Sequence, residues 1–387
     1  MANVLTNLIP DMTEAMDVVS REMVGMIPAV RRDSDVARAA IGQTVYIPVT
    51  PEASTGVNTP AVTAPDTGDQ TIDNVSIAIT KSKHVAVRWN GEETKGLKNA
   101  GTFSSIQAQR FYQGIRALVN EIEADLWAAA YVKASRAYGT AGTAPFGTAG
   151  DFSDFAGVAR ILDENGCPVN DRQLVLGHAA IANLRGKQSV LFKANEAGSS
   201  DMLRNGMTDR IQGMAIRHSD AVGLHTKGAG TGYDFGASGE AIGQTTITFE
   251  GGTVNSTGIK AGDVITHAGD SSNKYVVNTG STDTSGTFVL NAPGLLVAGV
   301  DANEMTIGGS YTANLAFDRS AVVLANRLPA LPDGGDAAED AVTLVDDRSG
   351  LVFEVALYRQ YLQNVFHVRA AWGQAAIKQA HIATLLG

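Results

Sequence analysis

The sequence predicts an α+β protein in which one very long helix accompanies an α/β unit that carries an inserted β-domain. Three observations predict this class. A helical stripe of apolar residues runs through residues 104–138, and mixed helix and strand patterns follow from residue 151. Short apolar alternations separated by turn residues then fill residues 239–312. Glycine supplies 42 of the 387 residues, which favours turns over helix bundles.

Composition and charge exclude several classes of function. The chain is 44% hydrophobic and 18% charged, so it can form a substantial core. Its 30 basic and 40 acidic residues give a net charge of −10, whereas a protein that reads duplex DNA normally shows a basic stripe. Any DNA contact is therefore expected to be loose and non-specific. The start of the chain lacks a signal-peptide pattern, and no stretch approaches 18 apolar residues. We therefore expect synthesis in the cytoplasm and no membrane partner.

The first ninety residues predict an arm and an extended hairpin. Apolar residues recur at helical spacing through residues 12–27, and Pro28 is expected to end that helix before the polar residues 31–35. An arm lying on another surface and an ordinary first helix of a domain explain this pattern equally well. Strand patterns at 44–50 and 75–80 flank a long polar tip, and a further strand is expected at 84–89. So long a loop usually has a function, and a disordered insert is the alternative.

The clearest pattern in the chain is the predicted helix at residues 104–138. Apolar residues fall at intervals of three and four, at Phe111, Ile115, Leu118, Val119, Ile122, Leu126 and Ala130. Thr102, Ser104 and Ser105 are candidate N-caps, and Gly139 is the expected stop. A helix of about 35 residues would be about 50 Å long, several times the usual length. Such a rod extends beyond any small core.

The rest of the chain predicts an α/β unit interrupted by a β-domain. The expected helices are 153–163 and 178–184, and the expected strands of the α/β unit are 173–176, 214–218, 316–325 and 351–357. Strand-like and mixed apolar runs at 360–368 and 375–383 close the chain. Between them, short strands at 246–249, 263–266, 275–277, 287–290 and 305–307 have the spacing of a small barrel or sandwich. Because α/β character resumes afterwards, we interpret this block as an insertion.

No motif predicts a catalytic, cofactor-binding or metal site. The glycine-rich residues 228–232 lack the strand and helix that a phosphate loop needs, and are interpreted as a flexible domain junction. The seven histidines, which include His218 before Ser219 and Asp220, lie singly, without metal spacing or a nucleophile elbow.

Two further groups are expected to be structural. Glu121 with Glu123, and Asp346 with Asp347, resemble carboxylate pairs on solvated faces. Cys167, the only cysteine, excludes an intrachain disulfide and is expected to be a structural thiol. We therefore expect a protein that is not an enzyme and has no catalytic residues, no cofactor and no metal ligand.

The order of these elements resembles the major capsid protein of tailed bacteriophages. That family has the Hong Kong 97-type (Johnson) fold, which herpesviruses and encapsulins share. Residues 203–219 look like the family's turn-and-strand segment of the axial domain. Residues 257–266 and 314–325 are similar to the inserted β-domain and the returning strand of a podovirus-like coat subgroup. The resemblance covers essentially the whole chain.

The resemblance implies a division of the chain into parts. Residues 1–43 would be the N-terminal arm, 44–90 the extended loop, and 91–150 the peripheral domain with a spine helix at 104–138. The axial domain would comprise 151–227 and 312–387, the latter with closing peripheral strands, and the inserted β-domain, a small barrel, would be 228–311.

The resemblance also implies partners and a location. The chain would bind itself in hexamers and pentamers, forming an icosahedral shell around double-stranded phage DNA. A separate scaffolding protein and a portal protein are expected partners, and a decoration protein is a further candidate. The location would be the virion capsid, assembled in the cytoplasm of the host bacterium.

Two departures from relatives and two rival interpretations qualify this reading. Some relatives crosslink a lysine at the loop tip to a neighbouring subunit. Residues 51–80 contain no lysine, so no such crosslink is expected. Relatives with a fused scaffold begin with a long charged helix, which is missing here; a separate scaffold is therefore expected.

An encapsulin-type nanocompartment is the alternative function, although such shells typically lack the inserted domain. A carbohydrate-binding or surface-layer β-protein would explain residues 239–312 but not the long helix.

Overall fold

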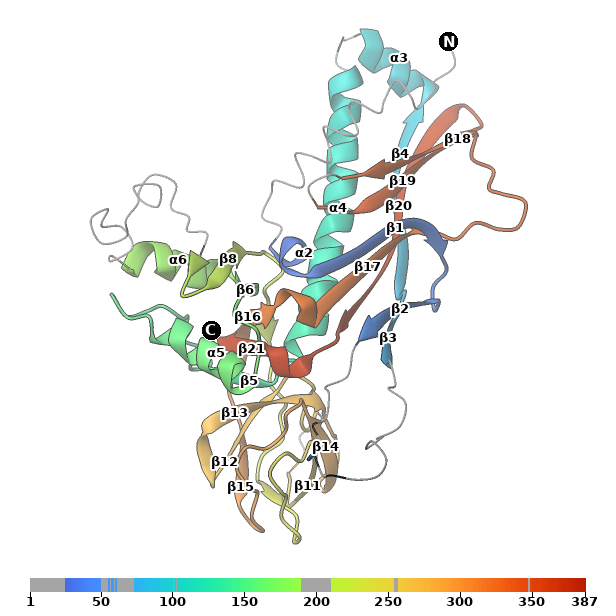
Figure 1. Ribbon diagram of the computed structural model, residues 1–387. Helices are drawn as coiled ribbons and strands as arrows, with labels where there is room; N and C mark the ends of the chain where they lie inside the picture. The colour runs from blue at the N-terminus through green and yellow to red at the C-terminus, as the bar shows by residue number, and fades with distance from the viewer. Residues whose placement is uncertain are drawn as a thin grey trace.

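The computed structural model describes residues 25–49, 55, 57–58, 60, 73–99, 101, 103–188, 210–253, 257–346 and 349–387. Figure 1 shows an elongated molecule with the long helix α4 and a sheet at one end, and a small β-barrel at the other. Between them lies a second sheet, beside which the C-terminus is found. The predicted residues 12–24 and 203–209, and most of the hairpin tip, lie outside the described residues.

The first sheet gathers strands from both ends of the chain. Its order is β1-β17-β20-β19-β18, and β4 also pairs with β20. The bounds are Arg31–Ala39 (β1), Lys81–Asn90 (β4), Val322–Pro329 (β17), Asp340–Val345 (β18), Val352–Gln360 (β19) and Gln363–Ala376 (β20). β1 runs parallel to β17, so residues 31–39 of the expected N-terminal arm are strand residues of this sheet. The helix α3 (Gly91–Asn99) follows β4.

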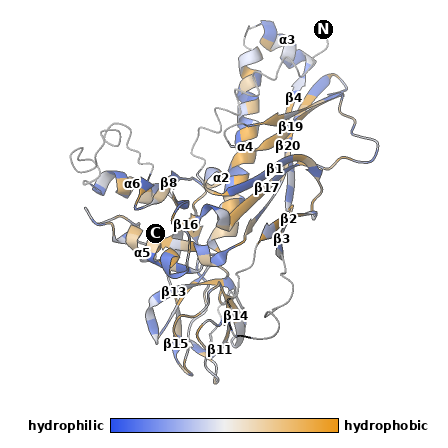
Figure 2. Cartoon of the chain, viewed as in Figure 1, coloured by the Kyte–Doolittle hydropathy of each residue, from blue (hydrophilic) through white to orange (hydrophobic). Residues whose placement is uncertain are grey.

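The helix α4 spans Phe103–Tyr131 and packs against β4 and β20. Its buried stripe contains the predicted apolar positions, from Phe111 to Ala130, and hydrophobic residues follow the helix along its length (Figure 2). The predicted end at residue 138 is wrong. The chain turns after Tyr131, and Arg136–Tyr138 forms the strand β5, which pairs with β21 and β13. Ala134 and Ala137 are buried, but in the turn and the strand that follow the helix.

The hairpin predicted from the alternating residues is present. β2 (Thr44–Val49) and β3 (Asp73–Ala78) pair antiparallel, with Thr44 opposite Ala78 and Val49 opposite Asp73. They form a two-stranded sheet of their own, which lies beyond the end of β1 and β17 in Figure 1. The strand β4 continues from this hairpin and joins the first sheet along its whole length.

The second sheet forms the α/β unit. The strands β5, β21, β16, β6, β8 and β7 are neighbours in that order, and β9 also pairs with β16. The bounds are Arg172–Leu176 (β6), Arg210–Ile211 (β7), Met214–His218 (β8), Leu224–His225 (β9), Tyr311–Asp318 (β16) and Ile382–Leu386 (β21). The expected helices are confirmed as α5 (Ser153–Glu164) and α6 (His178–Lys187).

The glycine- and threonine-rich block forms a closed antiparallel barrel. Its six strands pair in the cyclic order β12-β15-β10-β11-β14-β13, because β12 also pairs with β13. The bounds are Tyr233–Phe235 (β10), Thr246–Glu250 (β11), Val264–His267 (β12), Asp270–Thr279 (β13), Gly286–Leu290 (β14) and Glu304–Ile307 (β15). Alternate side chains fill the interior, including Phe235, Phe249, Tyr275 and Phe288. The predicted small barrel is therefore confirmed.

Four details of the predicted elements are wrong. The expected strand 316–325 is two strands, because the 3-10 turn η3 (Arg319–Ala321) redirects the chain from the second sheet to the first. Likewise, a turn at Tyr361 and Leu362 interrupts the run 360–368, and η4 (Gln379–His381) interrupts 375–383. Pro28 does not end a helix: it lies within the short helix α2 (Met26–Ala29), in whose first turn an N–H is not required.

Candidate assembly surfaces and their anchors

One face of the β2–β3 hairpin is exposed, and the other packs against the first sheet. Ile47 and Ile77 are buried in a cluster with Val323 and Ala371 of the first sheet, whereas Tyr46 is 67% exposed. At the root, a Cβ on Gly373 would lie 2.0 Å from the Ala78 carbonyl oxygen. Only a glycine in β20 allows this approach. The hairpin is therefore a projecting surface with a fixed base.

Arginines fasten β1 to the first sheet. Arg38 binds Glu354 of β19 through both terminal nitrogens, and Arg327 of β17 binds the Asp33 carboxylate at 2.9 Å. Glu354 is 2% exposed and also accepts from Arg369 at 2.7 Å. Burial would raise the pKa of Glu354, but the hydrogen bonds from Arg38 and Arg369 outweigh it and hold the pKa below its usual value. This carboxylate is ionised and links three strands.

Glu123 of α4 anchors the chain just before β1. Its carboxylate accepts from the backbone N–H groups of Met26 at 2.9 Å and Ile27 at 2.7 Å, and from the Ser219 hydroxyl at 2.8 Å. Burial raises the pKa of this carboxyl, and the hydrogen bonds oppose the rise. The prediction that Glu121 and Glu123 form a solvated pair is wrong for Glu123, which is 3% exposed. Side chains two apart on a helix point in different directions.

Glu121, in contrast to Glu123, forms ion pairs at the surface between α4 and β4. It accepts from Lys81 at 2.8 Å and from Lys83, and Lys81 also binds Asp125 at 2.8 Å. The second oxygen of Asp125 accepts from the indole N–H of Trp372 in β20. The first residues of β4, where the chain leaves the hairpin, are thus tied to the long helix.

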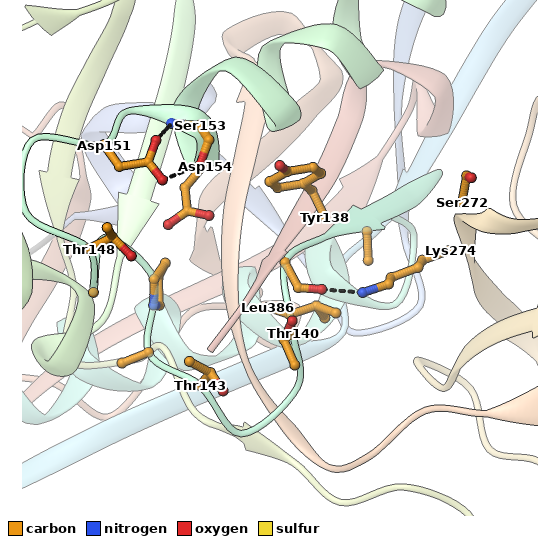
Figure 3. A pocket seen from close by; sticks show the side chains of 15 residues that line it. Tyr138, Thr140, Thr143, Thr148, Asp151, Ser153, Asp154, Ser272, Lys274 and Leu386 are labelled. Carbon is orange, nitrogen blue, oxygen red and sulfur yellow. Dashed lines mark hydrogen bonds between the residues drawn. The ribbon is translucent and has the colours of Figure 1, made fainter.

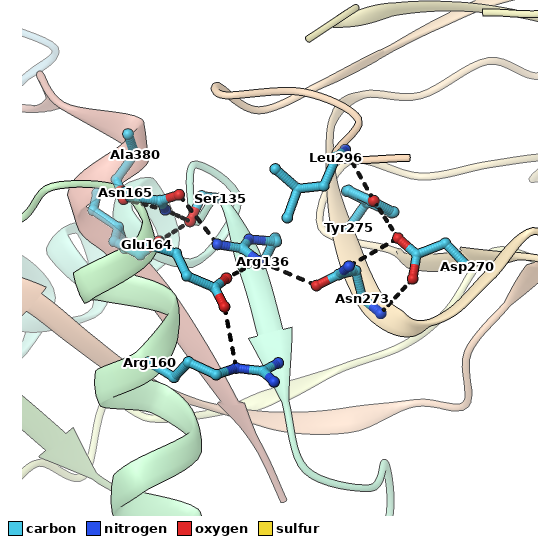
Figure 4. A network of polar contacts seen from close by, with 11 residues as sticks. Ser135, Arg136, Arg160, Glu164, Asn165, Asp270, Asn273, Tyr275, Leu296 and Ala380 are labelled. Carbon is cyan, nitrogen blue, oxygen red and sulfur yellow. Dashed lines mark hydrogen bonds and ion pairs between the residues drawn. The ribbon is translucent and has the colours of Figure 1, made fainter. Parts of the chain in front are cut away.

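The barrel is joined to the α/β unit through a buried arginine (Figure 4). Arg136 of β5 is 1% exposed and binds Glu164 of α5 at 2.6 Å, Asn273 of β13 at 3.1 Å and Asn165 at 3.2 Å. Asp270 continues the network, accepting from Asn273 and from the Tyr275 hydroxyl at 2.6 Å. Since β5 also pairs with β13, the barrel and the second sheet are one continuous sheet.

A second buried pair holds the point where the chain enters the barrel. His225 and Asp263 are 2.8 Å apart and almost fully buried. Asp263 also accepts from the backbone N–H groups of Gly228 and Lys260. The rings of Tyr131 and Tyr311 pack on either side of His225, at 5.6 and 5.2 Å. The interpretation of residues 228–232 as a flexible domain junction stays a prediction, and Asp263 holds Gly228 at the start of this segment.

A hollow of about 420 Å³ lies between the α/β unit and the barrel (Figure 3). Its charged side chains are engaged with the protein. Asp151 accepts from Ser153, Asp154 accepts from the Phe146 N–H at 2.6 Å, and Lys274 donates to the Gly139 carbonyl. These three charged groups therefore have structural partners within the chain.

The structure pairs histidines that are distant in sequence. His178 and His218 are 2.8 Å apart, and His178 lies 2.7 Å from Asp220, in an exposed chain of three groups. His84 and His367 pack ring to ring at 4.6 Å. The histidines lie singly along the sequence, and these two pairs arise in space because β4 pairs with β20 and because β6, which ends just before His178, pairs with β8. Among the residues that the structure describes, no three His, Cys, Asp or Glu side chains are placed to hold a metal ion.

The remaining sequence candidates have structural surroundings. Ser219, next to His218, donates its hydroxyl to Glu123. Cys167 is buried, and burial raises the pKa of its thiol to about 11. Asp346 is 8% exposed and accepts from the Ser349 backbone, so the expectation of a solvated carboxylate is wrong there; Asp347 lies outside the described residues. None of the described helices is long and apolar enough to cross a membrane.

Comparison with solved structures finds capsids. The chain is similar to the capsid of the cyanophage P-SCSP1u, at 13% identity over 92% of this chain and 86% of that one, with a TM-score of 0.47. It is similar to the capsid of the empty GTA particle (10%, 95% and 90%, TM-score 0.44) and to the virus-like particle from Pyrococcus furiosus (8%, 97% and 98%, TM-score 0.43). No family model and no curated protein matches.

These likenesses at such low identity concern the fold alone. The order of elements within the chain is the one that the resemblance implied: hairpin, long helix, α/β unit, inserted barrel and returning strands. The predicted α+β class and the small barrel between the two parts of the α/β unit are confirmed by the elements themselves.

Proposed function

We propose that the chain is a structural shell subunit, the major capsid protein of a tailed bacteriophage. It assembles as hexamers and pentamers into an icosahedral shell that encloses double-stranded DNA. The observation that carries the proposal is the shape of one subunit. The 29-residue helix α4 braces a sheet from which the β2–β3 hairpin projects with a fixed base. A rigid body with a projecting hairpin suits a shell subunit that several neighbouring subunits contact at once.

The proposed division of labour follows the predicted boundaries. Residues 1–43 act as the arm, 44–90 as the extended loop, and 91–150 as the peripheral domain. Residues 151–227 and 312–387 act as the axial domain with the closing peripheral strands, and residues 228–311 act as the inserted domain. Because β4 pairs with β20 over its whole length, the reaching part of the extended loop is the β2–β3 hairpin and its tip. A separate scaffolding protein and a portal protein are the proposed partners in assembly, in the host cytoplasm.

Loose contact with DNA fits the charge of the chain. With 40 acidic and 30 basic residues, it cannot neutralise many phosphates, so the shell encloses DNA without holding it at fixed places.

An encapsulin-type shell around an enzyme is the second candidate. The closed barrel β10–β15 favours the phage coat, since the resemblance places such an insertion in the podovirus-like subgroup.

Electron microscopy of the purified chain tests the shell function. Closed icosahedral particles or hexameric sheets are expected, and a stable monomer that binds a small ligand would contradict the proposal. The contents of particles isolated from their natural source separate the two candidates. Double-stranded DNA is expected, whereas an enclosed enzyme would favour the nanocompartment.

A further inference from the structure

The described part of the chain begins at a residue that is held against the middle of α4. A Cβ on Gly25 would lie 2.5 Å from the His218 carbonyl oxygen, so the backbone there lies directly against the α/β unit. Met26 and Ile27 follow, fully buried, with both N–H groups on the Glu123 carboxylate. The position from which residues 1–24 depart is therefore fixed.

A stripe of α4 continues from this anchor towards the start of the helix. Arg116, Tyr112 and Gln109 precede Glu123 by about two, three and four helical turns, so they lie on the same side of the helix as the anchor. Together with Ile106, Arg110 and Gln113 they line a hollow of about 500 Å³. Ile106 and Tyr112 are partly buried apolar surface at its floor, and two arginines flank it.

Residues 1–24 have the length and chemistry to cover this hollow. Met12, Met16, Val19 and Met23 recur at helical spacing, which predicts an apolar stripe. The segment carries four acidic side chains against one basic side chain, Arg21. At helical rise, the seven residues before Gly25 would reach Arg116, and about fourteen would reach Gln109. In that position apolar surface would meet apolar surface, and acidic side chains would meet Arg110 and Arg116.

We propose that the 106–116 face of α4 is the docking surface for residues 12–24 of the same chain. The segment runs parallel to α4, starting from the Glu123 anchor, with Met16 beside Gln113 and Asp17 beside Arg116. A docked segment would extend the hydrophobic cover of the helix that braces the first sheet. This inference concerns one subunit, so it holds or fails whether or not the chain builds a shell.

Paired cysteines in the full chain test the docking directly. Met16→Cys with Gln113→Cys is expected to form an intrachain disulfide in dilute unassembled subunits under mild oxidation. The matched control is Met16→Cys with Ala128→Cys, an exposed α4 position on the other side of the anchor. We expect the first pair to form at least about fivefold more product than the control, because a disulfide needs closely spaced Cα atoms. The native Cys167 is buried and does not compete.

The outcomes are distinct on a non-reducing gel. A disulfide-linked monomer with the predicted pair supports docking on the same chain. Equal yields for the two pairs overturn the proposal, and so does a disulfide-linked dimer, which would place a neighbour's segment in the hollow.

Charge reversal gives a second, independent readout. Arg116→Glu is expected to slow disulfide formation by up to about fivefold, the range of an exposed ion pair, and Asp17→Arg added to it should restore the rate. Lys95→Glu, on α3, is the control and should leave the rate unchanged. If Asp17→Arg slows the reaction further in the Arg116→Glu background, the proposed charge pairing is wrong.

Discussion

Buried charges in this chain lie where segments distant in sequence meet. Glu123 joins α2, α4 and the end of β8, and Glu354 joins β1, β19 and β20. A buried ion is costly unless its hydrogen bonds are satisfied, so each site favours one arrangement of its segments. Such residues act as geometric constraints more than as sources of net stability.

Replacing Glu123 should weaken the subunit. Glu123→Gln keeps the size but turns one acceptor into a donor that faces backbone N–H groups, so the free energy of unfolding should fall by about 2 kcal/mol. Urea denaturation of the unassembled subunit measures this. Glu121→Gln is the control, because its partners are partly exposed, and should change stability by less than about 1 kcal/mol. Equal effects would contradict the anchoring role.

His267 gives the barrel a pH-dependent stability. The imidazole is 3% exposed, packs between Phe235 and Tyr275, and burial lowers its pKa from 6.5. Because the unfolded chain binds the proton first, the contribution is fully present above pH 6.5 and is lost as the pH falls towards the folded-state pKa. The loss from this group cannot exceed about 1.4 kcal/mol per pH unit.

The measurement compares urea denaturation at pH 7.5 and at pH values descending below 6.5. His267→Leu should show a shallower fall in the free energy of unfolding than the unmodified protein. Parallel curves for the two proteins would show that His267 does not titrate in this way.

At the scale of elements, the base of the hairpin depends on one glycine. Gly373→Ala would place a Cβ against the Ala78 carbonyl, so β3 and β20 would have to separate. We expect a loss of about 2 kcal/mol in the free energy of unfolding, and faster hydrogen exchange in β2 and β3. Gly96→Ala in α3 is the control: its Cβ meets open space, and it should stabilise by about 0.5–1 kcal/mol. Unchanged exchange in β2 and β3 would contradict the close-contact argument.

The join between barrel and α/β unit depends on Arg136. Arg136→Met keeps the aliphatic packing but leaves Glu164, Asn165 and Asn273 without their shared donor. Removing one partner of a buried ionic network typically costs about 3 kcal/mol. Thermal unfolding should show this loss, whereas Arg160→Met, whose side chain is 54% exposed, should show little. If the two variants unfold alike, the network does not join the two parts.

Sequence patterns predicted the elements better than their partners. The stripe of α4 and the alternations of the barrel are periodic, so they were predictable from the residues alone. The end of α4 was not, since Ala134 and Ala137 suit a helix and a buried strand equally. Nothing local marks that Glu123 is buried or that His178 meets His218. Both depend on contacts across 40 or more residues.

For the whole molecule, the proposed shell should be held without covalent crosslinks. The lysine-free hairpin tip offers no amine for an isopeptide bond to a neighbour, so contacts between subunits would be non-covalent. Assembled particles boiled in detergent and reductant should give a single band of one-subunit mass. A ladder of multiples would contradict this prediction and point to a crosslink elsewhere in the chain.

The pairing of β1 with β17 has a consequence for how the protein is made. Arg31 lies opposite Val323, so β1 is synthesised long before the strand with which it pairs. Contacts of such sequence separation are entropically expensive and form slowly. The first sheet cannot close until both segments have been synthesised, and β1 has no partner in this sheet before then. During that interval its unpaired edge favours association between incomplete chains.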